Sequence, residues 1–312
     1  MSLTTSKSAG VLDESELAAA AGRTGATTPP QPPPPAQAEP RPPTVIEPSA
    51  RRAGLGLAEV WAHRELLFFL TWRDVKVRYK QTALGAAWAV LQPVFMTLVF
   101  TVFFGRMAGL AGQVGVPYPL FALAGLVPWT FFANTLNTSG NSLVNNAGLI
   151  TKVYFPRVIV PVSAVAAGFV DFVLAFAVLA VLMAWYGVTP TASALMLFPL
   201  VLFTALFSLA VGMWVAALNV KYRDVRFVMP FATQLWLFVS SVILPSSAVG
   251  GRWRSLLLLN PMSGLIEGYR SALFGQPFDW RALGAAAAIT LAALAYSAYS
   301  FRRTEKHFAD IV

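Results

Sequence analysis

The residues best suited to binding or catalysis lie in two short segments that mix cations with aromatic rings. The first segment, 61–80, contains Arg73, Asp74, Arg78 and Tyr79. The second segment, 149–158, contains Lys152, Tyr154, Phe155 and Arg157. Arginine and aromatic side chains carry much of the binding free energy at protein–protein interfaces. Both segments are therefore predicted to contact a partner protein.

Several kinds of catalysis are disfavoured by what the sequence lacks. It has no cysteine, and His63 and His307 are its only histidines, so we expect neither thiolate chemistry nor a bound metal. The phosphate-binding pattern G-x-x-x-x-G-K-[ST] is absent, so the chain is not expected to hydrolyse ATP itself. A membrane-embedded glycosyl- or acyltransferase is a weaker alternative, because the 14 acidic residues do not converge on one segment.

The composition is that of a membrane protein. Of the 312 residues, 56% are hydrophobic and 12% are charged, whereas about 25% are charged in soluble proteins. The net charge of +9 is spread between apolar runs, so we expect no nucleic-acid partner. Runs of about 20 apolar residues cross a bilayer as helices. We predict six such spans, at about 84–105, 118–138, 161–185, 195–218, 227–245 and 282–301.

The remaining segments are expected to flank these spans. Residues 1–53 are rich in proline and are predicted to be a disordered cytoplasmic tail, followed by a membrane domain at 54–312. Residues 246–281 hold two apolar pieces too short to cross, which predicts a re-entrant hairpin on the outer side. Cations are concentrated in segments that an even number of spans would place inside. This pattern predicts that both termini are cytoplasmic.

The stretch 61–80 is predicted to be an amphipathic helix at the membrane interface. Phe68, Trp72, Val75 and Tyr79 recur at helical spacing and define an apolar face, and Asp74 and Arg78 can pair at i, i+4. Solvation or contact with lipid phosphates is the alternative to partner binding for this segment. Membrane anchoring is equally the alternative for 149–158.

A few residues within or between the apolar runs suggest further roles. Asp171 is expected to form a structural ion pair or hydrogen bond rather than a proton pathway. Glu267 and Arg270 either gate the outer exit or staple the hairpin together. Aromatic side chains either line a sugar channel or pack against lipid and protein. Those selected for the channel are Trp88, Phe100, Phe103, Phe104, Trp129, Phe132 and Trp236.

Four pieces of the sequence resemble one transporter family. They are WRDVKVRYKQTALGAAWAVLQP at 72–93, LITKVYFPRVIVPVSAV at 149–165, ALNVKYRDVRFVMPFATQLWLFVSSVILP at 217–245 and LNPMSGLIEGYRSALFG at 259–275. They are similar to permease subunits of type-2 ABC exporters. The nearest branch exports O-antigen and other polysaccharides, and its relatives export capsule and teichoic acid.

The resemblance implies a fold, partners and a cargo. The fold would be all-α, with six transmembrane helices, the interface helix 61–80 and a coupling helix at 149–158 that docks on a separate ATPase subunit. That ATPase would bind ATP and Mg, and no cofactor is expected in this chain. Two permeases and two ATPases would assemble in the bacterial cytoplasmic (inner) membrane.

The implied cargo is a polysaccharide linked to undecaprenyl pyrophosphate, whose charge would suit Arg73 and Arg78 at the cytoplasmic entrance. Capsule or teichoic acid, or a small lipid or drug, are the alternative cargoes.

Overall fold

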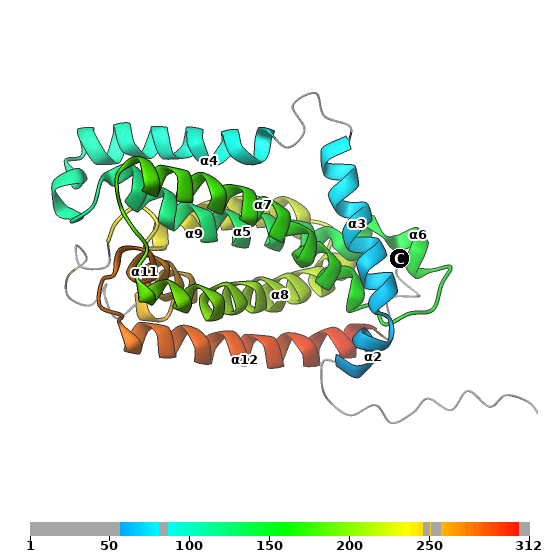
Figure 1. Ribbon diagram of the computed structural model, residues 1–312. Coiled ribbons are helices and arrows are strands. Elements are labelled where there is room, and N and C mark those ends of the chain that lie inside the picture. The colour runs from blue at the N-terminus through cyan, green and yellow to red at the C-terminus, as the bar shows by residue number, and fades with distance from the viewer. Residues whose placement is uncertain (1–56, 81–86, 246–249, 251–256, 306–312) are drawn as a thin grey trace, which may run out of the picture. The chain divides into compact units, whose positions relative to one another are not determined.

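The chain divides into two units, 1–51 and 52–312. The computed structural model describes residues 57–80, 87–245, 250 and 257–305, all in the second unit. The predicted tail at 1–53 lies outside the described residues. All regular elements in the described part are helical, which confirms the predicted all-α class there (Figure 1).

Five helices in the described part are long and apolar enough to cross a membrane, and they match five of the six predicted spans. The first, Ala87–Met107, consists of α4 (Ala87–Phe100) and a π-helical end (Thr101–Met107). The others are α5 (Tyr118–Asn145), α7 (Ile159–Trp185), α8 (Leu197–Lys221) with the 3₁₀ turn Ala192–Met196 before it, and α12 (Trp280–Glu305).

The predicted span at 227–245 is represented by a shorter helix. α9 (Val225–Val239) has 15 residues and is apolar. It ends earlier than predicted because Ser240 has an extended backbone, with φ −96° and ψ 154°. At 1.5 Å per residue, α9 measures roughly 22 Å, which is less than the ~30 Å hydrocarbon core. A sixth crossing therefore stays a prediction.

α5 is the central helix of the bundle. It packs most extensively against α8 and α7, and most of its apolar part is buried inside the chain. Glycines allow these close approaches. A Cβ atom at Gly212 of α8 would lie 2.7 Å from the Cβ of Ser139, and one at Gly168 of α7 would lie 2.3 Å from a methyl carbon of Thr135. Helices in membranes associate through such small residues, since lipid offers no hydrophobic driving force between them.

α11 (Pro261–Phe274) is a short helix that is almost entirely buried in the bundle. Its N-terminus is capped by Asn260, whose side-chain oxygen accepts hydrogen bonds from the Met262 amide and the Trp236 indole, both at 3.1 Å. α11 is one of the two short apolar pieces predicted within 246–281. Most of the other piece lies outside the described residues, so the hairpin itself stays a prediction.

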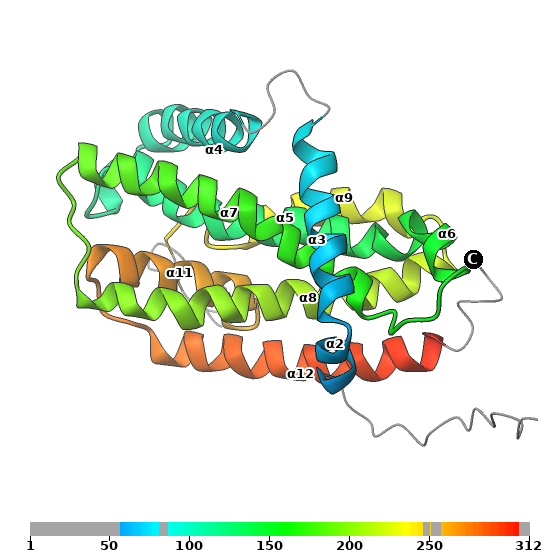
Figure 2. The same cartoon turned by 45° about the vertical axis from the view of Figure 1, so that its right-hand side comes forward.

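One end of the bundle has a hydrophobic cluster of its own. It joins Leu70 of α3 (Arg64–Lys80), Ile150 of the short helix α6 (Ala147–Ile150), Val220 of α8 and Phe301 of α12. Figures 1 and 2 show α3 crossing the bundle at this end, while the long helices run along it. The short helix α2 (Leu57–Ala62) precedes α3. This cluster therefore fixes α3 to α6 and to the ends of the long helices α8 and α12.

The close approach of α5 and α8 makes a testable prediction. Gly212→Ala should lower the free energy of unfolding by about 1–3 kcal/mol, because its Cβ would overlap Ser139. Gly284→Ala on α12 is the matched control, since no atom lies within 4 Å of its added Cβ. Thermal unfolding of the detergent-solubilised protein measures both. Equal stability of the two variants would contradict the proposed packing role of Gly212.

Candidate functional site

The C-terminal end of α3 is tied to the middle of a membrane-spanning helix. Arg78 forms an ion pair with one carboxylate oxygen of Asp171 on α7, and the Tyr79 hydroxyl donates a hydrogen bond to the other. A carboxylate within a span is costly unless it is paired. The expectation that Asp171 has a structural partner is therefore confirmed. Burial raises the pKa of Tyr79, and the hydrogen bond to Asp171 raises it further. The hydroxyl therefore keeps its proton and remains a hydrogen-bond donor.

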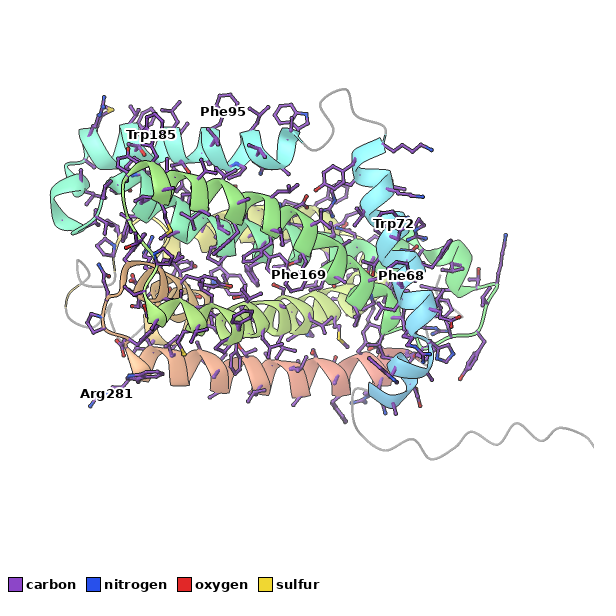
Figure 3. The ribbon with its side chains drawn as sticks, in the orientation of Figure 1. Phe68, Trp72, Phe95, Phe169, Trp185 and Arg281 are labelled. Atoms are coloured by element: carbon purple, nitrogen blue, oxygen red, sulfur yellow. The ribbon has the colours of Figure 1, made fainter. Side chains whose placement is uncertain are left out.

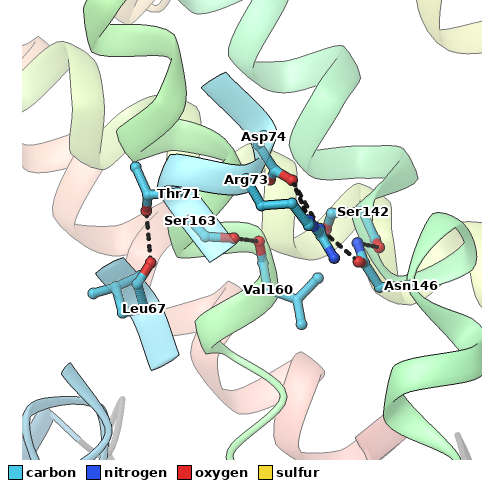
Figure 4. A network of polar contacts seen from close by, with 8 residues as sticks. All are labelled: Leu67, Thr71, Arg73, Asp74, Ser142, Asn146, Val160 and Ser163. Carbon is cyan, nitrogen blue, oxygen red and sulfur yellow. Dashed lines mark hydrogen bonds and ion pairs between the residues drawn. The ribbon is translucent and has the colours of Figure 1, made fainter. Parts of the chain in front are cut away.

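A second polar contact ties α3 to the corner between α5 and α6. The Arg73 guanidinium donates to the Asp74 carboxylate and to the side-chain oxygen of Asn146, both at 2.7 Å (Figure 4). The predicted Asp74–Arg78 pair is wrong. Asp74 is engaged by its neighbour Arg73, while Arg78 pairs with the half-buried Asp171 across the helix interface. The four residues of α3 that were predicted to contact a partner protein therefore also hold α3 against the bundle. They are Arg73, Asp74, Arg78 and Tyr79.

The predicted apolar face of α3 is divided between two sides of the helix. Phe68 and Trp72 are exposed and lie away from the bundle core, whereas Tyr79 turns inward to Asp171 (Figure 3). Lys76 lies 5.4 Å from the Trp72 ring, in a cation–π contact. The prediction of one apolar face is therefore wrong, because α3 binds the bundle through Leu70 and through polar contacts. Its outer face presents aromatic rings and cations to lipid or to a partner.

The segment 149–158 is mostly not helical. Only Leu149 and Ile150 lie in a helix, and turns or irregular backbone follow, so the predicted helix is wrong in its extent. Lys152 and Tyr154 are exposed, Tyr154 at 86%. Phe155 is only 5% exposed and belongs to the hydrophobic cluster at this end.

Arg157 ties this segment to the end of α12. Its guanidinium donates to the backbone oxygen of Glu305. Since Phe155 is also buried, the exposed surface of the segment is formed by Lys152 and Tyr154 rather than by all four predicted residues. Phe155 and Arg157 instead hold the segment against the bundle.

The seven aromatic residues predicted for a channel do not form one surface. Phe132 is 0% exposed and stacks on Phe207, with ring centroids 5.3 Å apart, and it also contacts Trp129 and Trp236 edge-on or tilted. These rings form a packed core, as the alternative interpretation expects. The others lie on the first span: Phe100 and Phe104 contact each other, whereas Trp88 and Phe103 are exposed.

Glu267 and Arg270 belong to a buried staple. The Arg270 side chain is 1% exposed, and its Nη1 lies 3.3 Å from Glu267 and 2.6 Å from the backbone oxygen of Ser241. Its other nitrogens donate to the backbone oxygens of Phe121 and Val242, and it stacks over the Phe121 ring at 3.5 Å. Arg270 thus joins α11, the start of α5 and the segment after α9, as the staple interpretation predicts.

One polar surface was missed at the sequence level. Thr130, Asn134, Asn137 and Thr138 of α5 line a groove of about 400 Å³ that also reaches α4 and α7. The sequence contains a pattern that predicts this polar surface. The four residues recur at i, i+4, i+7 and i+8 within a span, which places them on one face of a helix.

Comparison with known proteins identifies the class to which this architecture belongs. The model of the family described as ABC-2 type transporter matches residues 65–274. That range includes α3 from its second residue, four of the five span-length helices, α9 and α11. The chain belongs to the ABC-2 type transporter family, and it is a membrane-protein subunit of a transport system.

Its relatives carry more specific names. The chain is 32% identical over 259 residues to the O-antigen export system permease protein RfbA of Myxococcus xanthus, covering 81% of this chain and 98% of that protein. It is 28% identical to a protein of the same name from Klebsiella pneumoniae, covering 69% and 83%. It is 23% identical to the polysialic acid transport protein KpsM of Escherichia coli, covering 64% and 78%.

The link between α3 and α7 predicts energetic coupling. Arg78→Ala and Asp171→Ala should each lower the free energy of unfolding by about 1–3 kcal/mol, because the first removes the charged partner of the half-buried Asp171 and the second leaves Arg78 and Tyr79 without their acceptor. The double variant should lose less than the sum, by about 0.5–3 kcal/mol. Chemical unfolding in detergent gives the four values of this cycle.

Lys76→Ala is the control for that cycle, since Lys76 is an exposed cation on the same helix. Its effect should stay within about 0.5 kcal/mol of zero. Strict additivity of the Arg78 and Asp171 variants would show that the ion pair does not hold α3 to α7.

Proposed function

We propose that this chain is the permease subunit of an ATP-driven exporter that moves a lipid-linked polysaccharide across the bacterial cytoplasmic membrane. The observation that carries the proposal is the match to an O-antigen export permease over 98% of that protein's length. The five span-length helices and the α3 arrangement supply the structural support. The lipid would be undecaprenyl pyrophosphate, as the family resemblance implies.

We propose that the end of the bundle that carries α3 faces the cytoplasm. The hydrophobic cluster of Leu70, Ile150, Val220 and Phe301 lies at this end, and several cations are close to its members in the sequence. These cations are Arg73, Lys152, Arg157, Lys221, Arg302 and Arg303. Trp185 and Arg281 lie at the opposite end, where an aromatic belt would meet the outer interface (Figure 3). The positive-inside rule favours this orientation, with α9 and the residues after it completing six crossings.

A separate ATPase subunit would supply the energy. The sequence has no phosphate-binding pattern of its own. The surface proposed to receive the ATPase combines the exposed residues Lys152 and Tyr154 with the outer face of α3, which carries Trp72 and Lys76. Because Arg73 and Arg78 connect α3 to α5, α6 and α7, a displacement of α3 would be passed to the spans.

Two copies of the chain would form the transport path. In this family six spans make half of a pore, so the proposed complex holds two permeases and two ATPases. Capsule polysaccharide is the second candidate cargo, because the chain also matches polysialic acid transport proteins. O-antigen-type glycan is preferred, since those relatives match at higher identity and over more of the chain.

Deletion of the gene in its native host tests the proposed function. Surface polysaccharide should disappear, lipid-linked glycan should accumulate inside the membrane, and the intact gene should restore export. Normal surface polysaccharide in the deletion strain would contradict the proposal. A deletion that removes capsule and leaves O-antigen intact would select the second cargo.

The proposed ATPase surface makes a more local prediction. Tyr154→Ala should reduce export about tenfold or more, as expected for the loss of an aromatic interface anchor worth ~2 kcal/mol. Trp185→Ala, an equally exposed aromatic at the other end of the bundle, is the control and should export normally. Export is measured in cells, and ATP hydrolysis in the purified complex.

Arg157 is not a suitable position for this test, because its guanidinium also holds the segment to the end of α12. Tyr154→Ala should leave thermal stability unchanged while it weakens binding of the ATPase. Full export by Tyr154→Ala would remove this segment from the proposed interface.

A further inference from the structure

The groove between α4, α5 and α7 has one strongly polar wall. This wall is formed by four side chains of α5, namely Thr130, Asn134, Asn137 and Thr138. Trp88 and Gln92 of α4 line the groove opposite to it. Asn134, Thr138 and Gln92 are exposed, although they lie on helices of span length. In Figures 1 and 2, α4 lies along the edge of the bundle beside α7. The groove is therefore accessible from the side of the chain.

Amide side chains on a membrane span are not suited to face lipid. The hydrocarbon core offers no hydrogen-bond partners, and each unsatisfied polar group costs several kcal/mol there. Elsewhere α5 satisfies such groups inside the protein, as where Asn219 of α8 donates to Asn141 at 3.0 Å. In the groove, Thr130, Asn137 and Thr138 each donate one hydrogen bond to a carbonyl within α5, but their remaining acceptors and the exposed Asn134 face an open space. That space suits water or a polar ligand.

One buried acceptor in the groove has no partner in the part of the chain that the structure describes. The Asn137 side-chain nitrogen donates to the Ala133 carbonyl at 2.8 Å, but its buried side-chain oxygen has no hydrogen-bond partner among the described residues. A ligand with a hydrogen-bond donor would complete this interaction.

The groove also offers aromatic surface but no net charge. Trp88 is 53% exposed at its edge, and the rings of Phe131 and Phe172 form part of its lining. Arg78 and Asp171 lie at the groove but neutralise each other. A free phosphate or pyrophosphate would therefore meet no uncompensated cation there. A neutral ligand with hydroxyl groups and C–H-rich faces fits this combination better.

We propose that the groove binds sugar units of the lipid-linked glycan, separately from its pyrophosphate. Sugar hydroxyls donate and accept hydrogen bonds, as do the amides of Asn134, Asn137 and Gln92. The C–H face of a sugar ring would lie on Trp88. The volume of about 400 Å³ falls within the ~300–1,000 Å³ of small-molecule sites, so the groove suits a few sugar units rather than a polymer. This inference rests on the proposed function and names the part of the substrate that this groove receives.

Single cysteines test the proposal, because the native chain has none. Asn134→Cys and Thr138→Cys place a thiol in the groove, and Val173→Cys places one on a 61% exposed position of α7 outside it. Inverted membrane vesicles are treated with a sulfonated maleimide. Vesicles come from a strain that accumulates lipid-linked glycan and from one that makes no glycan. The groove cysteines should react in both, and Val173→Cys should react in neither.

Glycan should protect the groove positions. We expect labelling of Asn134→Cys to slow about fivefold in glycan-loaded vesicles, as for a ligand at about four times its dissociation constant. Equal rates with and without glycan would overturn the proposal. So would complete lack of reaction, which indicates a groove filled by phospholipid, or a disulfide between two copies at Asn134→Cys, which indicates a subunit interface.

Export by amide variants gives an independent measurement. Asn137→Ala should slow export about fivefold, as expected for one lost hydrogen bond, while the thermal stability and the ATPase rate of the complex stay unchanged. Asn137→Gln, which keeps the amide, should recover part of the rate. Normal export by Asn137→Ala would overturn the proposal. If deletion of the gene abolishes export while the groove results are negative, only this inference fails and the proposed function stands.

Discussion

The structure depends on one constraint: a polar group inside a bilayer has to find its partner within the protein or in a wet cavity. Asp171 meets this constraint through Arg78 and Tyr79 on α3. Arg270 meets it through three backbone oxygens and Glu267. These pairings determine where α3 crosses the bundle and how α11 is held inside it. The side-chain oxygen of Asn137, which is buried without a partner among the described residues, lies in the proposed ligand groove.

The central position of α5 connects these features. Its first turns contact Arg270 through Phe121, its middle lines the groove, and its end meets α3 through Asn146 at the α5–α6 corner. One helix therefore contacts the Arg270 staple, lines the proposed sugar site and meets α3, which carries part of the proposed ATPase surface. This continuity gives the proposed exporter a direct mechanical route, since a displacement of α3 acts on the helix that lines the groove.

The sequence predicted the helical class and five spans well, because long uncharged runs have a clear physical meaning in a bilayer. It also predicted a partner for Asp171. It failed where the outcome depended on tertiary contacts. Arg78 pairs with Asp171 on another helix rather than with the nearby Asp74. Phe155 is buried in a hydrophobic cluster, and Phe132 packs in an aromatic core. Periodicity gives the face on which a residue lies, but not which face meets protein, lipid or cavity.

The central claim is that this chain is a transport subunit that cannot drive export alone. Its most direct test is reconstitution into liposomes with a fluorescent lipid-linked glycan, in the presence and absence of the partner ATPase. We expect transfer of glycan across the bilayer only when both the ATPase and ATP are present. Transfer driven by this chain alone, at the same rate with and without its partner, would contradict the account.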